Sequence, residues 1–457
     1  MHPALQEIRL ATQNTAFEND LWLVGGAVRD ELLGIPHEAD FDLVTLGSSA
    51  ELAQLLFDKG VSTIAPVTYE RFGTAMVRVE HVNIEIVTAR KESYDENSRK
   101  PNVEPATLQD DAKRRDFTVN TLMRSVATGE LTDPLGQGLA DLEDKVLRTP
   151  LDPEATFHDD PLRMLRAIRF RWKLGFTPVP GLYEAITKTR ERLRIISSER
   201  IRDELIKMLS LPTAADCLSD LMTLGLLQIF APEFLPMVGC EQGKYHHLDV
   251  WNHTLLVVRN AGPGDPLLAL GALLHDVGKP PTRTIDEQGN TRFFGHEYKG
   301  AEIAHELLRR LKFAQADVDV VSRLVRNHMR LGSSPVFTPS AARRLIRDLD
   351  GDLDRLLQLV EADANGLKFG VRVMDLTAIR DQIENVRSVT PKRVIDSPLS
   401  GDEIIELTGL PPGREVGRLK LILTEAVIEG ELESGDKDGA RALIMRRLEN
   451  DEALLPK

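Results

Sequence analysis

The hydrophobic pattern of the chain changes once, near residue 150, and this change constrains the fold most. Before it lie a short apolar run at residues 21–24 and two alternating runs with β-branched residues at 74–79 and 82–87, and such runs predict strands. After about residue 160, apolar residues recur at intervals of three and four, which predicts helices. We therefore expect an α+β fold, with a small α/β head followed by a long all-helical part.

Glycine and proline clusters punctuate the helical part. They occur near residues 178–181, 262–264 and 332–335, and helical spacing resumes after residue 398, so we expect breaks between helices there. The length of 457 residues suggests two to four domains at about 100–200 residues each. The expected domains are a head over residues 1–150, a neck over 151–240, a body over 241–390 and a tail over 391–457.

Composition limits the class of protein. Hydrophobic residues make up 42% of the chain, and no apolar run approaches the ~20 residues that span a bilayer. The first residues lack the layout of a signal peptide. The only cysteines, Cys217 and Cys240, indicate no disulfide framework. We expect a cytoplasmic protein without membrane contact.

The charge of the chain is unevenly distributed. A net charge of −14 argues against a general nucleic-acid binder, because phosphate neutralisation needs lysine and arginine. Residues 161–210, however, hold twelve basic and five acidic residues. This basic stripe suits a nucleic-acid backbone, although a solvated helix face is the alternative.

The head contains a glycine turn followed by paired carboxylates. Gly25 and Gly26 follow an apolar run and open an expected helix, a layout that lets the backbone approach a phosphate. Asp40 and Asp42 lie two residues apart, so in an extended segment they point to one side. They would repel each other unless a cation lay between them. An isolated pair of this kind is more often a solvated turn, but the upstream glycines favour a metal site.

Glu85 supplies a third carboxylate. In the run at residues 82–87 it alternates with Val82, Ile84 and Ile86 and so takes the opposite face. Together with Asp40 and Asp42, it is suited to hold two Mg²⁺ ions about 3.5–4 Å apart. One ion would activate an attacking hydroxyl, and the other would clamp a triphosphate.

Two further clusters have side chains suited to a nucleotide. Residues 111–120 include arginines and an asparagine that fit a triphosphate and ribose hydroxyls. On a helix, Asp159 or Asp160 would share a face with Arg163. A carboxylate and a guanidinium match the donor–acceptor edge that cytosine and adenine share, whereas a surface salt bridge is the alternative.

The body contains a second group of candidate metal ligands. His275 and Asp276 end the apolar run at residues 267–274. Imidazole and carboxylate together suit a transition metal such as Mn²⁺, Ni²⁺ or iron, although a single histidine is more often a packed or surface residue. The other candidates are His253, His296, His328 and Asp363.

The ordered motifs of the first half resemble the class II CCA-adding enzymes and the related bacterial poly(A) polymerases. The resemblance rests on residues 25–30, 40–42, 114–120, 133–136, 159–163 and 196–204. It implies that Asp40 and Asp42 are the metal-binding pair, with Glu85 as third carboxylate, and that Asp160 and Arg163 read the base. Asp159 stands where the family usually has glutamate. The expected nucleotide-binding residues are Gly25, Gly26, Arg29, Asp30, Arg114, Arg115, Asp116, Asn120, Asp159, Asp160, Arg163 and Arg166.

The resemblance implies an enzyme that extends tRNA with CTP and ATP. Family members add all of CCA, only CC, only A, or a poly(A) tail. Enzymes restricted to CC have a shortened loop between two head motifs, whereas residues 91–101 look like an intact loop, which favours full CCA addition. Residues 401–403 and 412–417 look like the tRNA-contacting end of the family. A poly(A) polymerase and a CC- or A-only enzyme stay as alternatives.

The body resembles the HD phosphohydrolase superfamily. This resemblance implies that His253, His275, Asp276 and Asp363 are core metal ligands, and that His296 and His328 extend the site toward a second metal. A metal-dependent phosphohydrolase acting on RNA ends or nucleotides is therefore a further alternative, and a retained fold that binds metal poorly is its rival. The sequence leaves the oligomeric state open.

Overall fold

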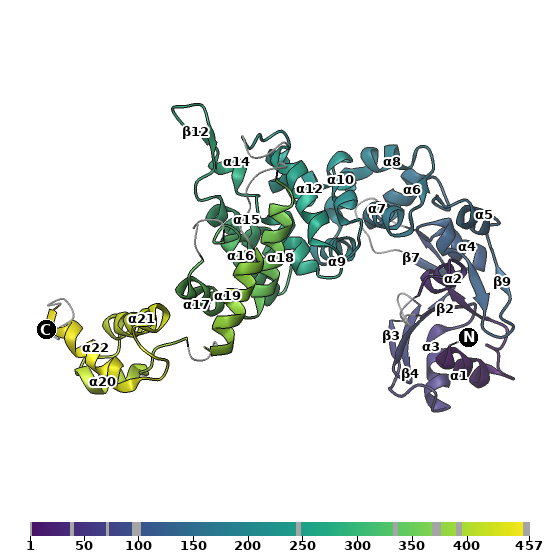
Figure 1. Cartoon of the computed structure of the whole chain (residues 1–457). Helices are drawn as coiled ribbons and strands as arrows, with labels where there is room; N and C mark the ends of the chain where they lie inside the picture. The colour runs from purple at the N-terminus through teal and green to yellow at the C-terminus, as the bar shows by residue number, and fades with distance from the viewer. Residues whose placement is uncertain are drawn as a thin grey trace. The chain divides into compact units, whose positions relative to one another are not determined.

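The computed structural model describes residues 2–36, 41–69, 73–93, 102–243, 248–331, 337–367, 376–389 and 395–450. The chain divides into two compact units (Figure 1). Unit 1 comprises residues 1–235 with 310–313, and unit 2 comprises residues 236–309 with 314–457. Asp40, residues 94–101 of the expected loop and the break at residues 332–335 lie outside the described residues. The finer domain boundaries at residues 150, 240 and 390 stay predictions.

A mixed β-sheet forms the centre of the head. Its strands lie in the order β3-β4-β5-β2-β1-β8-β9, and β2 and β5 run parallel. The three strands predicted from the sequence are confirmed as β1, β4 and β5. The bounds are β1 (Leu21–Val24), β2 (Phe41–Thr45), β3 (Val67–Tyr69), β4 (Thr74–Val79), β5 (Val82–Thr88), β8 (Met123–Ser125) and β9 (Leu131–Thr132).

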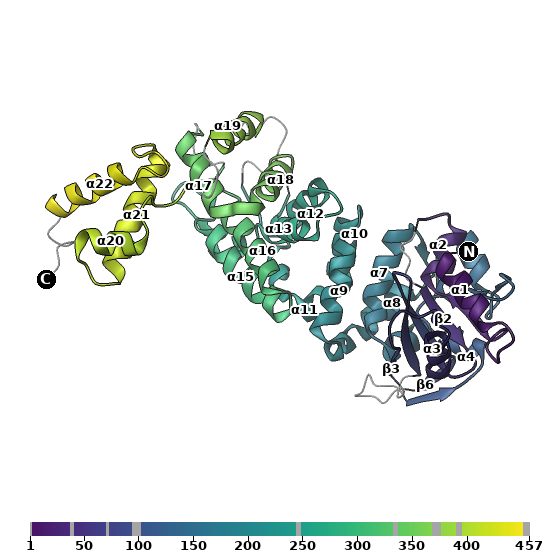
Figure 2. The ribbon, with the colours of Figure 1, turned by 90° about the horizontal axis from the view of Figure 1, so that it is seen from below.

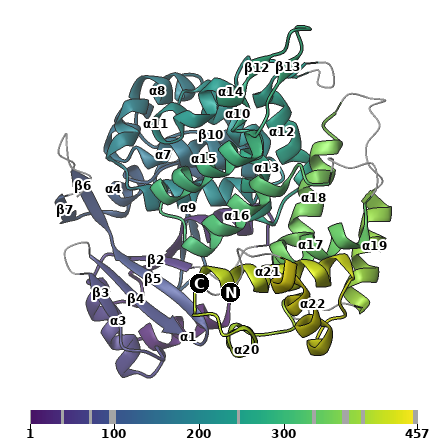
Figure 3. The same ribbon diagram turned by 90° about the vertical axis from the view of Figure 1, so that its left-hand side faces the viewer.

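Alternation along β4 and β5 makes one face of the sheet apolar and leaves the other accessible. Ala75 and Val77 of β4 and Ile84 of β5 are buried, and helix α3 (Ser49–Asp58) buries Leu52 and Leu56 as it packs against these strands. Figure 3 shows the head sheet and, beside it, the separate ribbon of β6 (Arg90–Ser93) and β7 (Asn102–Pro105).

The rest of unit 1 is mainly helical. Helices α7, α9 and α10 pack against one another (Figure 2), and residues 178–181 lie between α7 and α8, as predicted. The bounds are α1 (Pro3–Thr12), α2 (Gly26–Leu32), α4 (Leu108–Lys113), η2 (Thr118–Asn120), α5 (Gly138–Glu143), α6 (Pro153–Asp159), α7 (Leu162–Leu174), α8 (Leu182–Thr189), η3 (Arg190–Ile195), α9 (Ser198–Leu209), α10 (Ala214–Thr223) and α11 (Leu227–Phe230).

Unit 2 contains a helical core and a helical tail. Helix α13 is apolar almost throughout and packs against α12, α16 and α18, while the tail has its own core of buried side chains. The bounds are α12 (Val250–Ala261), α13 (Pro266–Leu274), α14 (Lys279–Thr282), β12 (Thr284–Ile285), β13 (Thr291–Arg292), α15 (His296–Arg310), α16 (Gln315–Asn327), α17 (Pro339–Leu349), α18 (Leu353–Ala364), α19 (Leu376–Val389), α20 (Gly401–Thr408), α21 (Arg414–Glu429) and α22 (Lys437–Asn450). None of the helices in the described residues is long and apolar enough to cross a membrane.

Candidate nucleotide and metal sites

Two of the three predicted head carboxylates lie side by side. Asp42 of β2 and Glu85 of β5 are directly opposed in neighbouring strands, and both are exposed. Opposed residues in paired strands lie on the same face, where like charges destabilise each other. Two carboxylates that share a face supply the oxygen ligands that Mg²⁺ prefers, so these residues fit the predicted ion.

A cavity of about 680 Å³ adjoins Asp42. Gly25 follows β1 with a positive φ of 77°, and an added Cβ there would lie 3.6 Å from Asp42 Oδ2 and 3.7 Å from an Arg115 guanidinium nitrogen. The predicted site residues that line this cavity are Gly25, Gly26, Arg29, Asp30, Asp42, Arg115, Asp116, Asn120 and Arg166. The lining given by the described residues does not include Glu85, Arg114, Asp159, Asp160 or Arg163.

A buried hydrogen-bond network joins the glycine turn to helix α7. Arg29 donates to Asn120 Oδ1 at 2.6 Å, and Asn120 donates to Asp116 Oδ1 at 2.9 Å. Arg166 donates to Asp116 Oδ2 at 2.8 Å. Burial alone would raise the pKa of Asp116, but Arg166 and Asn120 outweigh it and hold this pKa well below its usual range. The network therefore fixes charged groups at the cavity wall.

The cavity also has lining residues that the motif analysis missed. Phe170 is buried, and its ring lies under the guanidinium carbons of Arg169 at 4.4 Å, Arg29 at 4.9 Å and Arg166 at 5.3 Å. Lys173 and Arg169 also line the cavity. The basic stripe had included Arg169 and Lys173 only as members of a charged segment, and Phe170 was not singled out from the sequence.

The prediction that Asp160 and Arg163 share one helix is wrong. Helix α6 ends at Asp159, and Asp160 is extended with φ −132° and ψ 98°; α7 begins at Leu162, after Pro161. A proline disfavours helical backbone at the residue before it. Asp160 Oδ1 instead accepts from the Leu162 backbone N–H at 3.2 Å. The carboxylate therefore lies at a junction between two helices.

Both members of the proposed base-reading pair have protein partners. Asp160 forms an ion pair with Arg200 at 3.1 Å. Arg163 is buried and donates from its guanidinium to the backbone carbonyls of Thr156 and Arg114. Asp159 ends α6 one residue earlier.

Much of the basic stripe is paired internally. Arg169 and Glu204 form a buried pair at 2.6 Å, and Arg171 pairs with Asp220 at 2.8 Å. These contacts fasten α7 to α9 and α10. The stripe therefore serves packing within unit 1 at these positions, and only part of it lines the cavity.

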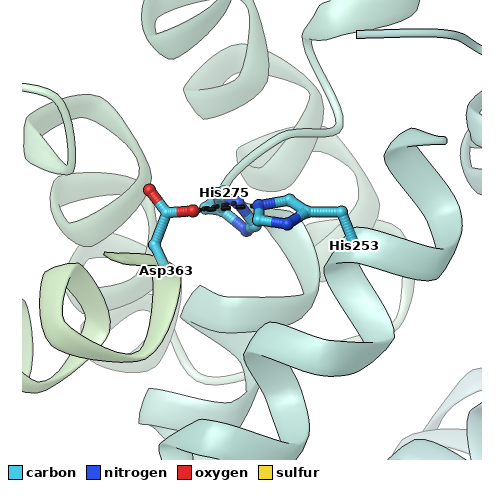
Figure 4. A group of neighbouring side chains, drawn as sticks. All are labelled: His253, His275 and Asp363. Carbon is cyan, nitrogen blue, oxygen red and sulfur yellow. Dashed lines mark hydrogen bonds and ion pairs between the residues drawn. The ribbon is translucent and has the colours of Figure 1, made fainter. Parts of the chain in front are cut away.

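The predicted metal ligands of unit 2 lie in two neighbouring groups. His253, His275 and Asp363 form one group (Figure 4), with His253 Nε2 2.9 Å from Asp363 Oδ1. The second group is Asp276, His296 and His328, and within each group the ligand atoms lie within 4.8 Å of one another. Asp276 connects the two, because its Oδ2 lies 3.1 Å from His275 Nε2 and its Oδ1 lies 3.5 Å from His296 Nε2.

Backbone contacts orient three of the imidazoles for metal binding. The Nδ1 atoms of His275, His296 and His328 lie 2.7, 2.9 and 2.6 Å from the carbonyl oxygens three residues earlier. A carbonyl only accepts, so each Nδ1 carries the proton, and in the neutral ring the Nε2 lone pair faces the site. His296 Nε2 and His328 Nε2 lie 3.2 Å apart. Facing lone pairs at this distance fit a site built around a cation.

The pKa shifts of two ligands act on metal binding in opposite directions, because the shift at His328 favours the neutral ring and the shift at His275 favours the protonated ring. Burial lowers the pKa of His328 to about 3, which keeps this ring neutral. Burial would also lower the pKa of His275, but Asp276 outweighs it and raises this pKa. Lys279 donates to Asp276 Oδ2 at 2.6 Å. Deprotonated carboxylates and neutral imidazoles are the forms that bind metals.

Comparisons with known proteins place the chain in a family. The family models that match are "Poly A polymerase head domain" at residues 21–148, "Probable RNA and SrmB- binding site of polymerase A" at 175–237 and "HD domain" at 244–365. An A-adding tRNA nucleotidyltransferase of Deinococcus radiodurans is 36% identical over 93% of this chain and 94% of its own length. The chain belongs to the tRNA nucleotidyltransferase and poly(A) polymerase family.

Other relatives within this family differ in their named products. A CC-adding tRNA nucleotidyltransferase of Thermus thermophilus is 34% identical over 93% of both chains. A multifunctional CCA protein of Xylella fastidiosa is 32% identical over 76% of this chain and 83% of its own. The crystal structure of the Bacillus stearothermophilus CCA-adding enzyme in complex with CTP has a TM-score of 0.71 at 24% identity, over 99% of this chain and all of that chain. This likeness confirms the predicted fold class.

Proposed function

We propose that the chain adds CCA to the 3′ ends of tRNA without a template, using CTP and ATP. The observation that carries the proposal is the cavity in which Asp42, the Gly25–Gly26 turn and the Arg29–Asn120–Asp116–Arg166 network meet. Family membership supports it, because named relatives extend tRNA. The cation-rich lining suits a triphosphate.

In the proposed reaction, the RNA 3′ hydroxyl attacks the α-phosphorus of the nucleotide. A P–O bond forms to the RNA, the bond to the β-phosphate breaks and pyrophosphate leaves in line with the attack. Asp40, Asp42 and Glu85 would hold Mg²⁺, which supplies Lewis acidity at the reacting oxygens. Arg29, Arg115 and Arg166 hold the phosphates.

Base selection is assigned to Asp160 and Arg163. A carboxylate accepts from the exocyclic amine of cytosine or adenine, and a guanidinium donates to the ring nitrogen beside it. The Arg200 contact leaves acceptor capacity on Asp160, because a carboxylate has about four lone-pair sites. Arg163 must leave at least one backbone partner to reach a base.

The test is extension of an end-labelled tRNA lacking CCA, read at nucleotide resolution. Two additions with CTP alone and three with CTP and ATP support the proposal. Stopping at CC in the presence of both nucleotides would assign a CC-adding enzyme, and activity only on tRNA ending in CC would assign an A-adding enzyme. An open-ended ladder with ATP would assign a poly(A) polymerase. Asp42→Asn should abolish extension, whereas the same change at Asp58, which is exposed at the end of α3, should not.

A second activity is favoured by the two ligand groups in unit 2. We infer that they bind Mn²⁺, Ni²⁺ or a similar ion and hydrolyse phosphate esters of nucleotides or RNA ends. Asp276, which connects the groups, and the facing Nε2 atoms of His296 and His328 support this assignment. His275→Ala should remove both bound metal, measured by mass spectrometry of the dialysed protein, and phosphatase activity, while tRNA extension persists. Full phosphatase activity in this variant would contradict the assignment.

A further inference from the structure

Large apolar side chains are exposed on the face of the head sheet that carries the two carboxylates. One row of directly opposed residues runs from Asp42 through Glu85 and Met76 to Val67. Tyr69 lies two residues beyond Val67 and so on the same face. The exposed fractions are 38% for Met76, 47% for Val67 and 50% for Tyr69. We call Val67, Tyr69 and Met76 the apolar strip.

The apolar strip lies across the carboxylates from the candidate nucleotide cavity. The sheet order around the site is β1-β2-β5-β4-β3. The cavity is lined by Gly25, at the end of β1, and by Asp42 of β2. Glu85 lies on the next strand beyond Asp42, and the apolar strip lies on the two strands after that. Cavity, carboxylates and apolar strip therefore follow one another across the sheet.

This order determines the side from which the RNA must arrive. In an in-line displacement the attacking oxygen and the leaving group lie on opposite sides of the phosphorus. With the triphosphate in the cavity, pyrophosphate leaves on the β1 side of Asp42. The attacking 3′ hydroxyl must then reach the carboxylates from the β5–β4–β3 side, which is the side of the apolar strip.

The side chains of the apolar strip suit an unpaired nucleotide. A tyrosine ring stacks on any base with about 1–3 kcal/mol, and a methionine adapts to an irregular apolar surface. Neighbouring strands lie about 4.8 Å apart, so Met76 lies one strand spacing from Glu85. Arg78 is also exposed on this face, two residues from Met76, where its guanidinium suits a backbone phosphate.

We propose that the apolar strip is the binding site for the unpaired 3′-terminal nucleotide of the RNA substrate, with Tyr69 stacking on its base. The site fixes the direction in which the terminal ribose faces Asp42 and Glu85. This inference rests on the proposed nucleotide addition. A protein partner on the same strip is the competing occupant, and the experiment separates the two.

The test compares Tyr69→Ser/Met76→Ser with the wild-type chain on a tRNA lacking CCA. Stacking of about 1–3 kcal/mol predicts that kcat/KM for this RNA falls about 5- to 150-fold, while KM for CTP is unchanged. The single variant Tyr69→Phe keeps the ring and should therefore keep the wild-type kcat/KM for this RNA. Phe57→Ser is the matched control, because Phe57 is 38% exposed on α3, which packs on the opposite face of the sheet.

A binding measurement isolates the terminal nucleotide. The wild-type chain should bind a tRNA with an unpaired 3′ nucleotide more tightly than one with a blunt acceptor end, and the double variant should lose this difference. Three results would overturn the inference. In the double variant, kcat/KM for RNA could be unchanged, KM for CTP could rise in parallel, or affinity could fall equally for both RNAs. A protein partner would then be the occupant to seek. Absence of extension by the wild-type chain would instead refute the proposed function.

Discussion

Removal of the Glu204 carboxylate should loosen the contact between α7 and α9. Glu204 is 4% and Arg169 9% exposed at the side chain, and Nε lies 2.6 Å from Oε2. Glu204→Leu leaves the Arg169 charge buried without its partner, and breaking such a pair costs about 3–5 kcal/mol. Arg166, at 3.6 Å from Glu204, loses a second contact. We take about 3 kcal/mol as the expected loss.

Hydrogen exchange measured by mass spectrometry can test this magnitude locally. A loss of about 3 kcal/mol speeds exchange about 150-fold, at 1.36 kcal/mol per factor of ten, in peptides from α7 and α9. Peptides from α21, in the other unit, are the internal control. Arg169→Met/Glu204→Leu removes both charges and should recover much of the protection, since no uncompensated charge stays buried. Acceleration below about fivefold in the single variant, or equal acceleration in both variants, would refute the reasoning.

Three further predictions concern other parts of the chain. Gly278→Ala should destabilise unit 2 strongly, because its Cβ would lie 2.1 Å from the His296 carbonyl oxygen; thermal unfolding checks this, and the open site Gly351 is the control. His253→Ala should lower the metal content of the dialysed protein. An unchanged metal content would contradict the assignment of His253, His275 and Asp363 as one metal-binding group. The lowered pKa of Asp116 should add stability above pH about 4 that is lost as pH falls further. Urea unfolding of Asp116→Asn should therefore differ from wild type more at pH 7 than at pH 3.

Sequence reasoning predicted regular elements best where one periodicity was uncontested. The strands at residues 74–79 and 82–87 alternate cleanly, and the structure has them as β4 and β5. The apolar run before His275 likewise forms α13, with His275 at its C-terminal end. In these segments the burial pattern and the local preference agree.

The sequence-based predictions failed where a single local break or a single tertiary contact determined the position of a side chain. Helical spacing over residues 159–163 concealed the break that Pro161 imposes, so Asp160 was placed on the wrong element. Spacing also could not separate Arg166, which lines the cavity while paired with Asp116, from Arg171, which pairs with Asp220 and is not among the described lining residues. Ion pairing depends on which helices meet, and helix packing is a tertiary property.

The guanidinium groups gathered around the Phe170 ring link the stability of unit 1 to ligand binding. Three guanidinium groups lie within 5.3 Å of the ring centroid, and only the folded chain brings them together. A polyanion held by these groups therefore binds the folded chain and not the unfolded one. Linkage then stabilises unit 1 by about 2.7 kcal/mol when free nucleotide exceeds its Kd a hundredfold. Resistance of this unit to proteolysis should thus track the supply of nucleoside triphosphate, so that a starved cell holds a more labile enzyme than a growing one.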